Sequence, residues 1–225
     1  MKLLKIKDHQ MWTLFVLPGT LLLVLVLGFP AAQSILYSIY PEGGGSSYTL
    51  SNYSVLFKDS VFRQVFGNTV VFVLLSVVSH LFLGLGVALV LNKEIFAKPL
   101  FRLIALLPWV VPDVVAGIIW KWMYDPIYGA LNDLLIKVGL ISTHIPWLYN
   151  PKMALLSVVF VNLWRGFPFV MLILLAGLQS IPRVLYEAAA IDGASRWQLF
   201  IRITLPSLKK MFVVALALDI VWEVR

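Results

Sequence analysis

The stretch MALLSVVFVNLWRGFPFVMLILLAGL, residues 153–178, decides the fold class of this chain. A helix needs about 20 apolar residues to cross the hydrocarbon core of a bilayer, and this stretch is long enough. Three further apolar blocks of similar length precede it, at Met11–Ala32, Asn68–Leu91 and Leu100–Trp120. We therefore expect an all-α integral membrane protein that crosses the bilayer several times.

The composition supports this class. Hydrophobic residues make up 60% of the chain and charged residues 13%, with a mean hydropathy of +0.91, whereas a soluble domain carries about 25% charged residues. The absence of cysteine excludes disulfides and thiolate sites. The sequence pI near 9.7 fits basic cytoplasmic loops better than nucleic-acid binding. The first apolar block is longer than the core of a signal peptide, about 7–15 residues, so we expect a retained helix.

Lysine and arginine orient the spans. With the N-terminus in the cytoplasm, most of them fall on the inner side, many within residues 179–210, as the positive-inside rule requires. We expect a multi-pass protein of the cytoplasmic (inner) membrane of a bacterium or archaeon. Residues 1–66 would hold the first span and a flexible extracytoplasmic loop around the glycine-rich Pro41–Ser47. Residues 67–225 would hold the transmembrane core.

The cytoplasmic segment 179–210 predicts a helix–turn–helix hairpin. An alanine-rich helix at Val184–Ile191 would end at Gly193, since glycine accepts the left-handed conformation after a helix. Ser195–Gln198 has the form of a capping box and would open a second helix that ends before Leu205–Pro206. From spacing alone, the hairpin is either a docking element for a soluble partner or a surface loop packed under its own helices. On the other side of the membrane, residues 131–138 predict a short surface helix.

Polar residues within apolar spans are candidates for function. The third and fourth blocks contain four that could line a solute pathway: Asp113, Asn162, Trp164 and Arg165. Tryptophan faces suit the C–H surfaces of sugars, and polar side chains suit their hydroxyls. The alternative places Asp113 near the outer water interface and pairs Arg165 with another subunit. Three prolines in these blocks could break helices toward a cavity: Pro108, Pro112 and Pro168.

Enzymatic chemistry is not expected. The spans show no paired carboxylates, histidine cluster or serine–base arrangement, so no catalytic residue and no metal site are predicted. His80 is expected to be a packed or hydrogen-bonded residue. Without a Gly-x4-Gly-Lys-Ser/Thr motif, the chain is not expected to bind ATP or any other cofactor.

Two stretches of the cytoplasmic segment carry a resemblance. Residues 187–193, EAAAIDG, and 200–206, FIRITLP, resemble the cytoplasmic EAA loop of binding-protein-dependent ABC importer permeases. Residues 107–109, 120–126 and 174–182 resemble the carbohydrate-uptake branch of that family.

This resemblance implies a type I ABC importer bundle with a cytoplasmic coupling loop. The chain would be the permease subunit that translocates a sugar or oligosaccharide delivered by an extracytoplasmic solute-binding protein. Its other partners would be a second permease and a dimer of ATP-binding subunits, which use ATP and magnesium. Eight residues of the loop would dock the ATPase: Tyr186, Glu187, Ala188, Ala189, Asp192, Gly193, Ser195 and Arg196.

Two alternatives remain open. The family also transports other solutes, such as a glycerol phosphate. In addition, the last apolar block, Met211–Val221, is too short to cross about 30 Å of hydrocarbon, and members of the family carry further spans beyond it. The chain is therefore expected to be truncated at its C-terminus, and could be a fragment that does not transport.

Overall fold

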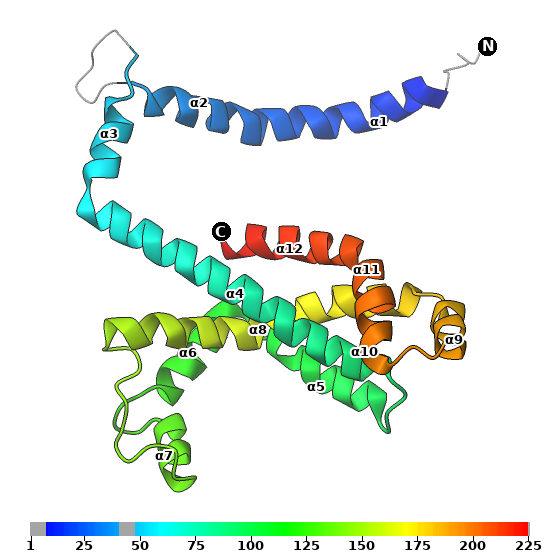
Figure 1. Cartoon of the computed structure of the whole chain (residues 1–225). Helices are drawn as coiled ribbons and strands as arrows, with labels where there is room; N and C mark the ends of the chain where they lie inside the picture. The colour runs from blue at the N-terminus through cyan, green and yellow to red at the C-terminus, as the bar shows by residue number, and fades with distance from the viewer. Residues whose placement is uncertain (1–7, 41–47, 225) are drawn as a thin grey trace, which may run out of the picture. The chain divides into compact units, whose positions relative to one another are not determined.

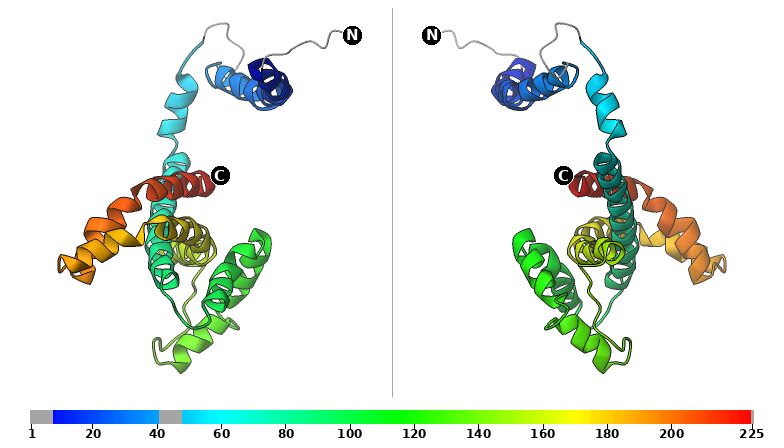
Figure 2. Two further views of the ribbon diagram at one scale, coloured as in Figure 1. Left: turned by 90° about the vertical axis from the view of Figure 1, so that its right-hand side faces the viewer. Right: turned by 90° about the vertical axis from the view of Figure 1, so that its left-hand side faces the viewer.

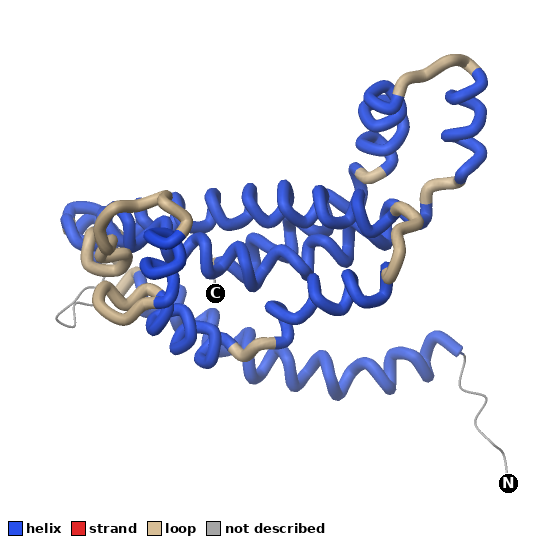
Figure 3. Tube along the Cα trace, turned by 90° about the horizontal axis from the view of Figure 1, so that it is seen from below, coloured by secondary structure: helices blue, strands red, loops and turns tan. Residues whose placement is uncertain are grey.

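A computed structural model describes residues 8–40 and 48–224 of the chain (Figure 1). These residues form helices and connecting loops, without a strand among them (Figure 3). They divide into two compact units, with the boundary between Phe66 and Gly67. The predicted flexible loop at Pro41–Ser47 and the lysines before residue 8 lie outside the described residues.

The first unit contains a long apolar helix, and its continuous apolar run explains why it forms. It comprises α1 (Asp8–Leu23), a π-helical turn (Val24–Gly28) and α2 (Phe29–Ser38). Phe15–Ser38 is long and apolar enough to cross a membrane, as the predicted first span requires. After α2, the Asn52 side chain in α3 (Ser51–Lys58) donates hydrogen bonds to the carbonyls of Ser38 and Tyr40.

The second unit is built around two long helices. These are α4 (Ser60–Asn92), which begins in the first unit, and α8 (Pro151–Ser180). Both contain segments that are long and apolar enough to cross a membrane, Ser60–Asn92 and Met153–Ser180, as the predicted second and fourth spans require. Helix α8 packs against both α5 and α12, and it occupies the middle of this unit (Figure 1).

The predicted third span is bent rather than straight. Residues 98–123 form α5 (Lys98–Val110) and α6 (Asp113–Met123), which meet at an angle of 94°. The bend lies at Val111–Pro112, where both residues are extended, because a proline disfavours the helical conformation of the residue before it. Pro112 therefore breaks the span as expected, whereas Pro108 and Pro168 lie within continuous helices.

The segment between α6 and α8 contains the predicted short helix, α7 (Ala130–Lys137). The buried Asn132 amide holds the following loop, because its oxygen accepts from the Ile145 N–H and the Trp147 indole while its nitrogen donates to the Ile145 carbonyl. The Tyr124 hydroxyl donates to the Ser157 carbonyl at 3.0 Å, which ties the loop to α8.

Glycines permit the close packing of the core. A Cβ on Gly84 of α4 would lie 3.0 Å from the backbone nitrogen of Met171 in α8. A Cβ on Gly177 of α8 would lie 2.8 Å from Leu208, just before α12. The core cluster here includes Leu174, which is fully buried, whereas many other large apolar side chains are exposed and available to lipid or other subunits.

The segment 179–210 forms the predicted hairpin, which projects from the side of the second unit in both views of Figure 2. Its elements are α9 (Arg183–Ile191), α10 (Arg196–Leu199), a π-helical turn (Phe200–Thr204), α11 (Leu205–Ser207) and α12 (Lys209–Glu223). The Ser195–Gln198 capping box is present, with both reciprocal hydrogen bonds. The expected helix end before Leu205–Pro206 is wrong, because Pro206 lies in the first turn of α11, where proline's missing N–H has no cost.

Candidate functional site

The predicted docking residues share the α9–α10 hairpin. Gly193 has φ of +78° and turns the chain between the two helices, as expected from its type. Most of the eight predicted residues are exposed, and two are partly buried, Tyr186 and Ala189. Tyr186 points back toward the π-helical turn and bonds Thr204. The hairpin therefore presents a polar outer surface and is anchored on its inner side.

A cavity of about 520 Å³ lies within the second unit. Three of the four predicted pathway residues line it together, Asp113, Asn162 and Arg165. Trp164 is not among its lining residues, because it packs edge-on against Trp120 with ring centroids 5.6 Å apart. The other lining residues are Phe72, Trp109, Gly166, Asp219, Trp222 and Glu223.

Arg165 pairs with Asp113 of the same chain, across the cavity from α8 to α6. The alternative expectation paired Arg165 with another subunit, and the structure instead supplies an internal partner. Because the bend at Pro112 starts α6 at Asp113, it carries this carboxylate to the arginine.

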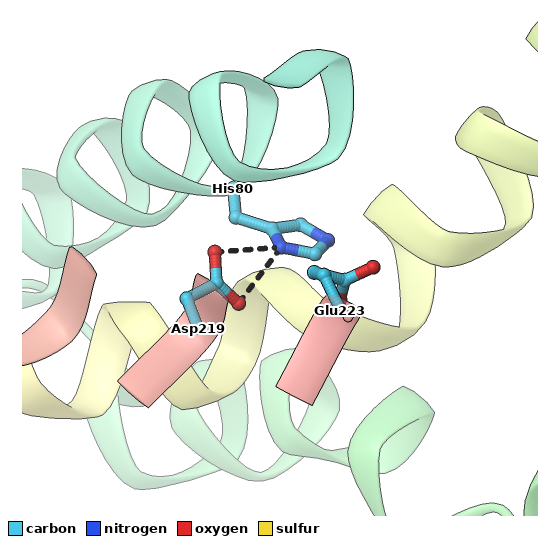
Figure 4. Close-up of side chains that lie close together, drawn as sticks. All are labelled: His80, Asp219 and Glu223. Carbon is cyan, nitrogen blue, oxygen red and sulfur yellow. Dashed lines mark hydrogen bonds and ion pairs between the residues drawn. The ribbon is translucent and has the colours of Figure 1, made fainter. Parts of the chain in front are cut away.

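A histidine lies close to two carboxylates, and both carboxylates line the cavity (Figure 4). His80 comes from α4, while Asp219 and Glu223 lie one turn apart on α12. The His80 Nδ1 lies 3.1 Å from both carboxylate oxygens of Asp219. His80 is fully buried and Asp219 is 2% exposed, so this pair is shielded from solvent within the unit.

Asn162 on α8 connects these groups. Its backbone carbonyl accepts a hydrogen bond from His80 Nε2 at 3.0 Å, and its side-chain amide donates to Glu223 at 2.5 Å. The imidazole lies directly over Gly166, where any added Cβ would overlap the ring. These contacts bind α4, α8 and α12 together at the cavity.

The expectation that His80 is hydrogen-bonded is confirmed. The sequence shows no paired carboxylates or histidine cluster in the spans, but the structure brings His80 beside Asp219, which is 139 residues away in sequence. Sequence reasoning missed Asp219 and Glu223 as site residues. A signal was present, since ionisable residues four apart in an apolar helix share one face and are costly in lipid.

Comparison with protein families identifies the family to which this chain belongs. Residues 80–224 match the family described as binding-protein-dependent transport system inner membrane component. The chain belongs to this family. The matched residues of the permease contain both the α9–α10 hairpin and the cluster at His80.

Individual relatives agree with the family. The permease is 36% identical to the sulfoquinovosyl glycerol transport system permease protein SmoG of Agrobacterium fabrum, over 95% of its own length and 70% of that protein. It is 42% identical to the trehalose/maltose transport system permease protein MalF of Thermococcus litoralis, over 70% of its own length and 52% of that protein.

The fold of the permease also matches a solved structure. A chain of a bacterial alginate ABC transporter, crystallised in complex with an alginate pentasaccharide-bound periplasmic protein, aligns with a TM-score of 0.79. The alignment covers 95% of the permease and 72% of that chain, at 24% sequence identity. The permease therefore has the fold of a type I ABC importer subunit, as the sequence predicts.

Proposed function

We propose that the permease translocates a sugar or oligosaccharide delivered by an extracytoplasmic solute-binding protein. The observation that carries this proposal is the lining of the cavity. Three aromatic side chains, Phe72, Trp109 and Trp222, offer faces to the C–H surfaces of a sugar, and the polar groups beside them can bond hydroxyls. The names of the relatives SmoG and MalF, which refer to sugar transport systems, support the same solute class.

A neutral sugar fits the charges of the cavity better than a glycerol phosphate. The one guanidinium among the lining residues, Arg165, is already paired with Asp113. Glu223 adds a carboxylate whose hydrogen-bond partner, the Asn162 amide, is neutral. An anionic solute would meet like charge here, which costs binding energy, whereas neutral hydroxyls can donate to the Glu223 carboxylate.

Energy for transport would come from partner subunits. In this proposal a dimer of ATP-binding subunits binds ATP and magnesium, a second permease completes the pathway, and this chain binds no cofactor. The exposed hairpin residues Glu187, Asp192 and Arg196 would dock the ATPase. The helices that flank the hairpin, α8 and α12, are also those that carry Asn162, Arg165, Asp219 and Glu223, so a movement of the hairpin reaches the cavity through continuous helices.

The orientation follows from the same arrangement. A hairpin that docks a cytoplasmic ATPase must itself be cytoplasmic, and three crossings between it and the N-terminus would place the N-terminus on the opposite side of the membrane. If the bent pair α5–α6 also crosses, four segments lie between the N-terminus and the hairpin. Four crossings place the N-terminus and the hairpin on the same side. The positive-inside bias supports that second topology, with the N-terminus in the cytoplasm.

The test is reconstitution of the permease with its cognate ATP-binding subunit, second permease and solute-binding protein in proteoliposomes. We expect ATP-dependent uptake of neutral oligosaccharides and not of glycerol phosphate. Glu187→Lys should lower co-purification of the ATPase by about tenfold or more, because a like charge would face a basic partner, while Glu187→Gln should retain it. Uptake of glycerol phosphate alone would overturn the solute assignment, and equal co-purification of both variants would overturn the docking assignment.

A further inference from the structure

The buried imidazole of His80 faces hydrogen-bond acceptors on both of its nitrogens. Nε2 bonds the Asn162 carbonyl, which can only accept, so Nε2 carries a proton. Nδ1 lies 3.1 Å from both oxygens of the Asp219 carboxyl group. A bare Nδ1 lone pair would repel an ionised carboxylate at this distance, so a second proton lies between the two groups, on either the ring or the acid.

The His80–Asp219 pair is therefore neutral as a unit. It is an imidazolium with a carboxylate, or a neutral imidazole with a carboxylic acid, and both forms carry no net charge. The Asp113–Arg165 pair is also neutral. Among the described residues of the cavity, Glu223 is left as the carboxylate without a salt bridge, because its hydrogen-bond partner is the neutral amide of Asn162.

We propose that His80 is a positioning residue of the solute pathway, and that it acts by sharing a proton with Asp219. The expected effect on solute uptake rests on the proposed transport function, whereas the presence of the shared proton follows from the geometry. The shared proton removes one negative charge from the cavity wall and holds α12 against α4. Through its second nitrogen, His80 also fixes the backbone of Asn162, whose side chain orients the Glu223 carboxylate toward the cavity.

The geometry favours a proton over a metal ion at this position. The ligand atoms of His80, Asp219 and Glu223 lie within 4.8 Å of one another, a spacing that a divalent ion could also use. However, the Glu223 oxygen already receives the Asn162 amide, and Nδ1 lies equally far from both Asp219 oxygens, as an N–H shared between two acceptors does. Two protons on the pair satisfy every one of these contacts.

Three variants test the proposal in the reconstituted complex. His80→Gln can donate a hydrogen bond but cannot share the proton, so it leaves a buried carboxylate uncompensated, and we expect uptake to fall by about tenfold or more. Asp219→Asn keeps both contacts of a neutral imidazole, since its amide donates to Nδ1, and should stay within about threefold of wild type. The double variant His80→Gln/Asp219→Asn removes the uncompensated charge and should recover uptake to within about threefold.

This rescue separates charge from packing. If His80 only fills space over Gly166, the double variant will be as impaired as His80→Gln, which would overturn the proposal. The exposed His144, which pairs with Asp133 outside the cavity, supplies the matched control, and His144→Gln should leave uptake unchanged.

Two further measurements keep the test decisive. Thermal unfolding of the variants in detergent does not depend on the solute. If their stabilities follow the same order as the expected uptake, the shared proton is supported even when the complex takes up no sugar. Absence of sugar uptake would then count against the proposed function alone. If His80→Gln does not fold, recovery of folded protein in the double variant supports the proposal, and lack of recovery overturns it. One equivalent of a divalent metal in the purified wild-type complex, lost in His80→Gln, would also overturn it.

Discussion

The phenolic oxygen of Tyr186 lies 2.9 Å from the Oγ1 of Thr204, and this hydrogen bond joins α9 to the π-helical turn at Phe200–Thr204. Thr204 is buried, and its Oγ1 also lies 3.4 Å from the Leu199 carbonyl. A π-helical turn often marks a functional position within a helix. Here it lies between the hairpin and α12, which carries Asp219 and Glu223 to the cavity. The bond therefore links the proposed docking surface to the helix that lines the cavity through a side-chain contact, in addition to the covalent connection along the backbone.

Removing this hydroxyl should weaken the link between the hairpin and the cavity. We expect Tyr186→Phe to destabilise the permease by about 1 kcal/mol, the usual net value of one hydrogen bond, and to lower the amount of sugar transported per ATP hydrolysed. Parallel uptake and ATPase assays in proteoliposomes measure that ratio. Tyr128→Phe is the control, because Tyr128 is 77% exposed in the loop between α6 and α7. An unchanged ratio in Tyr186→Phe would show that the bond plays no part in transmission.

The turn at Gly193 gives a second prediction. Its positive φ is strained for a β-branched residue, so Gly193→Val should cost the hairpin about 1–3 kcal/mol and reduce co-purification of the ATP-binding subunit. Gly193→Asn is the matched control, because asparagine enters the left-handed region more readily. Hydrogen exchange across residues 185–199 reports the local stability. If both variants exchange alike, the backbone conformation of this turn does not limit the hairpin.

Features with a local signal were predictable from sequence. The glycine turn and the Ser195 capping box depend on residues within four positions of each other, and both are present. The apolar runs that become Ser60–Asn92 and Met153–Ser180 are local in the same sense. The bend at Pro112 was only partly predictable, since Pro108 and Pro168 carry the same steric restriction and do not break their helices.

Features that depend on packing were not predictable in this way. His80 meets Asp219 because α4 approaches α8 closely at Gly84 and Gly166 while α12 packs on α8, and no spacing in the sequence encodes that meeting. The placement of Trp164 on Trp120, away from the cavity, depends on the rotation of α8 about its axis. A single sequence indicates that polar residues in apolar helices are special, but it does not identify their partners.

Two glycines of α4 give a third prediction, because they differ in their neighbours. A Cβ at Gly84 would lie 3.0 Å from both the Met171 nitrogen and Val170 Cγ1, whereas nothing lies within 4 Å of a Cβ at Gly86. Gly84→Ala should therefore destabilise the packing of α4 on α8 by about 1–3 kcal/mol. Gly86→Ala should be neutral or stabilise the helix by up to about 1 kcal/mol. Thermal unfolding in detergent measures both, and equal effects would contradict the close approach of the two helices at Gly84.

The last prediction concerns pH and the turn at Asp125, outside the spans. The Asp125 carboxylate accepts hydrogen bonds from the backbone N–H groups of Ile127 and Tyr128, each at 2.8 Å, and these bonds hold the pKa of Asp125 below its usual range. A lowered pKa means that the charged form stabilises the folded turn. This stabilisation is complete above the ordinary aspartate pKa of about 3.9 and is lost as the pH falls through the lower folded value.

Amide hydrogen exchange of residues 127–129, corrected for the intrinsic effect of pH, should therefore show constant protection from neutral pH down to about 5 and a decrease below about 4. Asp125→Asn lacks the titrating group, so its protection should be lower at neutral pH and should not change across the acid range. Asp133→Asn, on the neighbouring helix α7, controls for a general loss of negative charge in this segment. If protection in the wild type stays constant in acid, the two hydrogen bonds do not depend on the charge of Asp125.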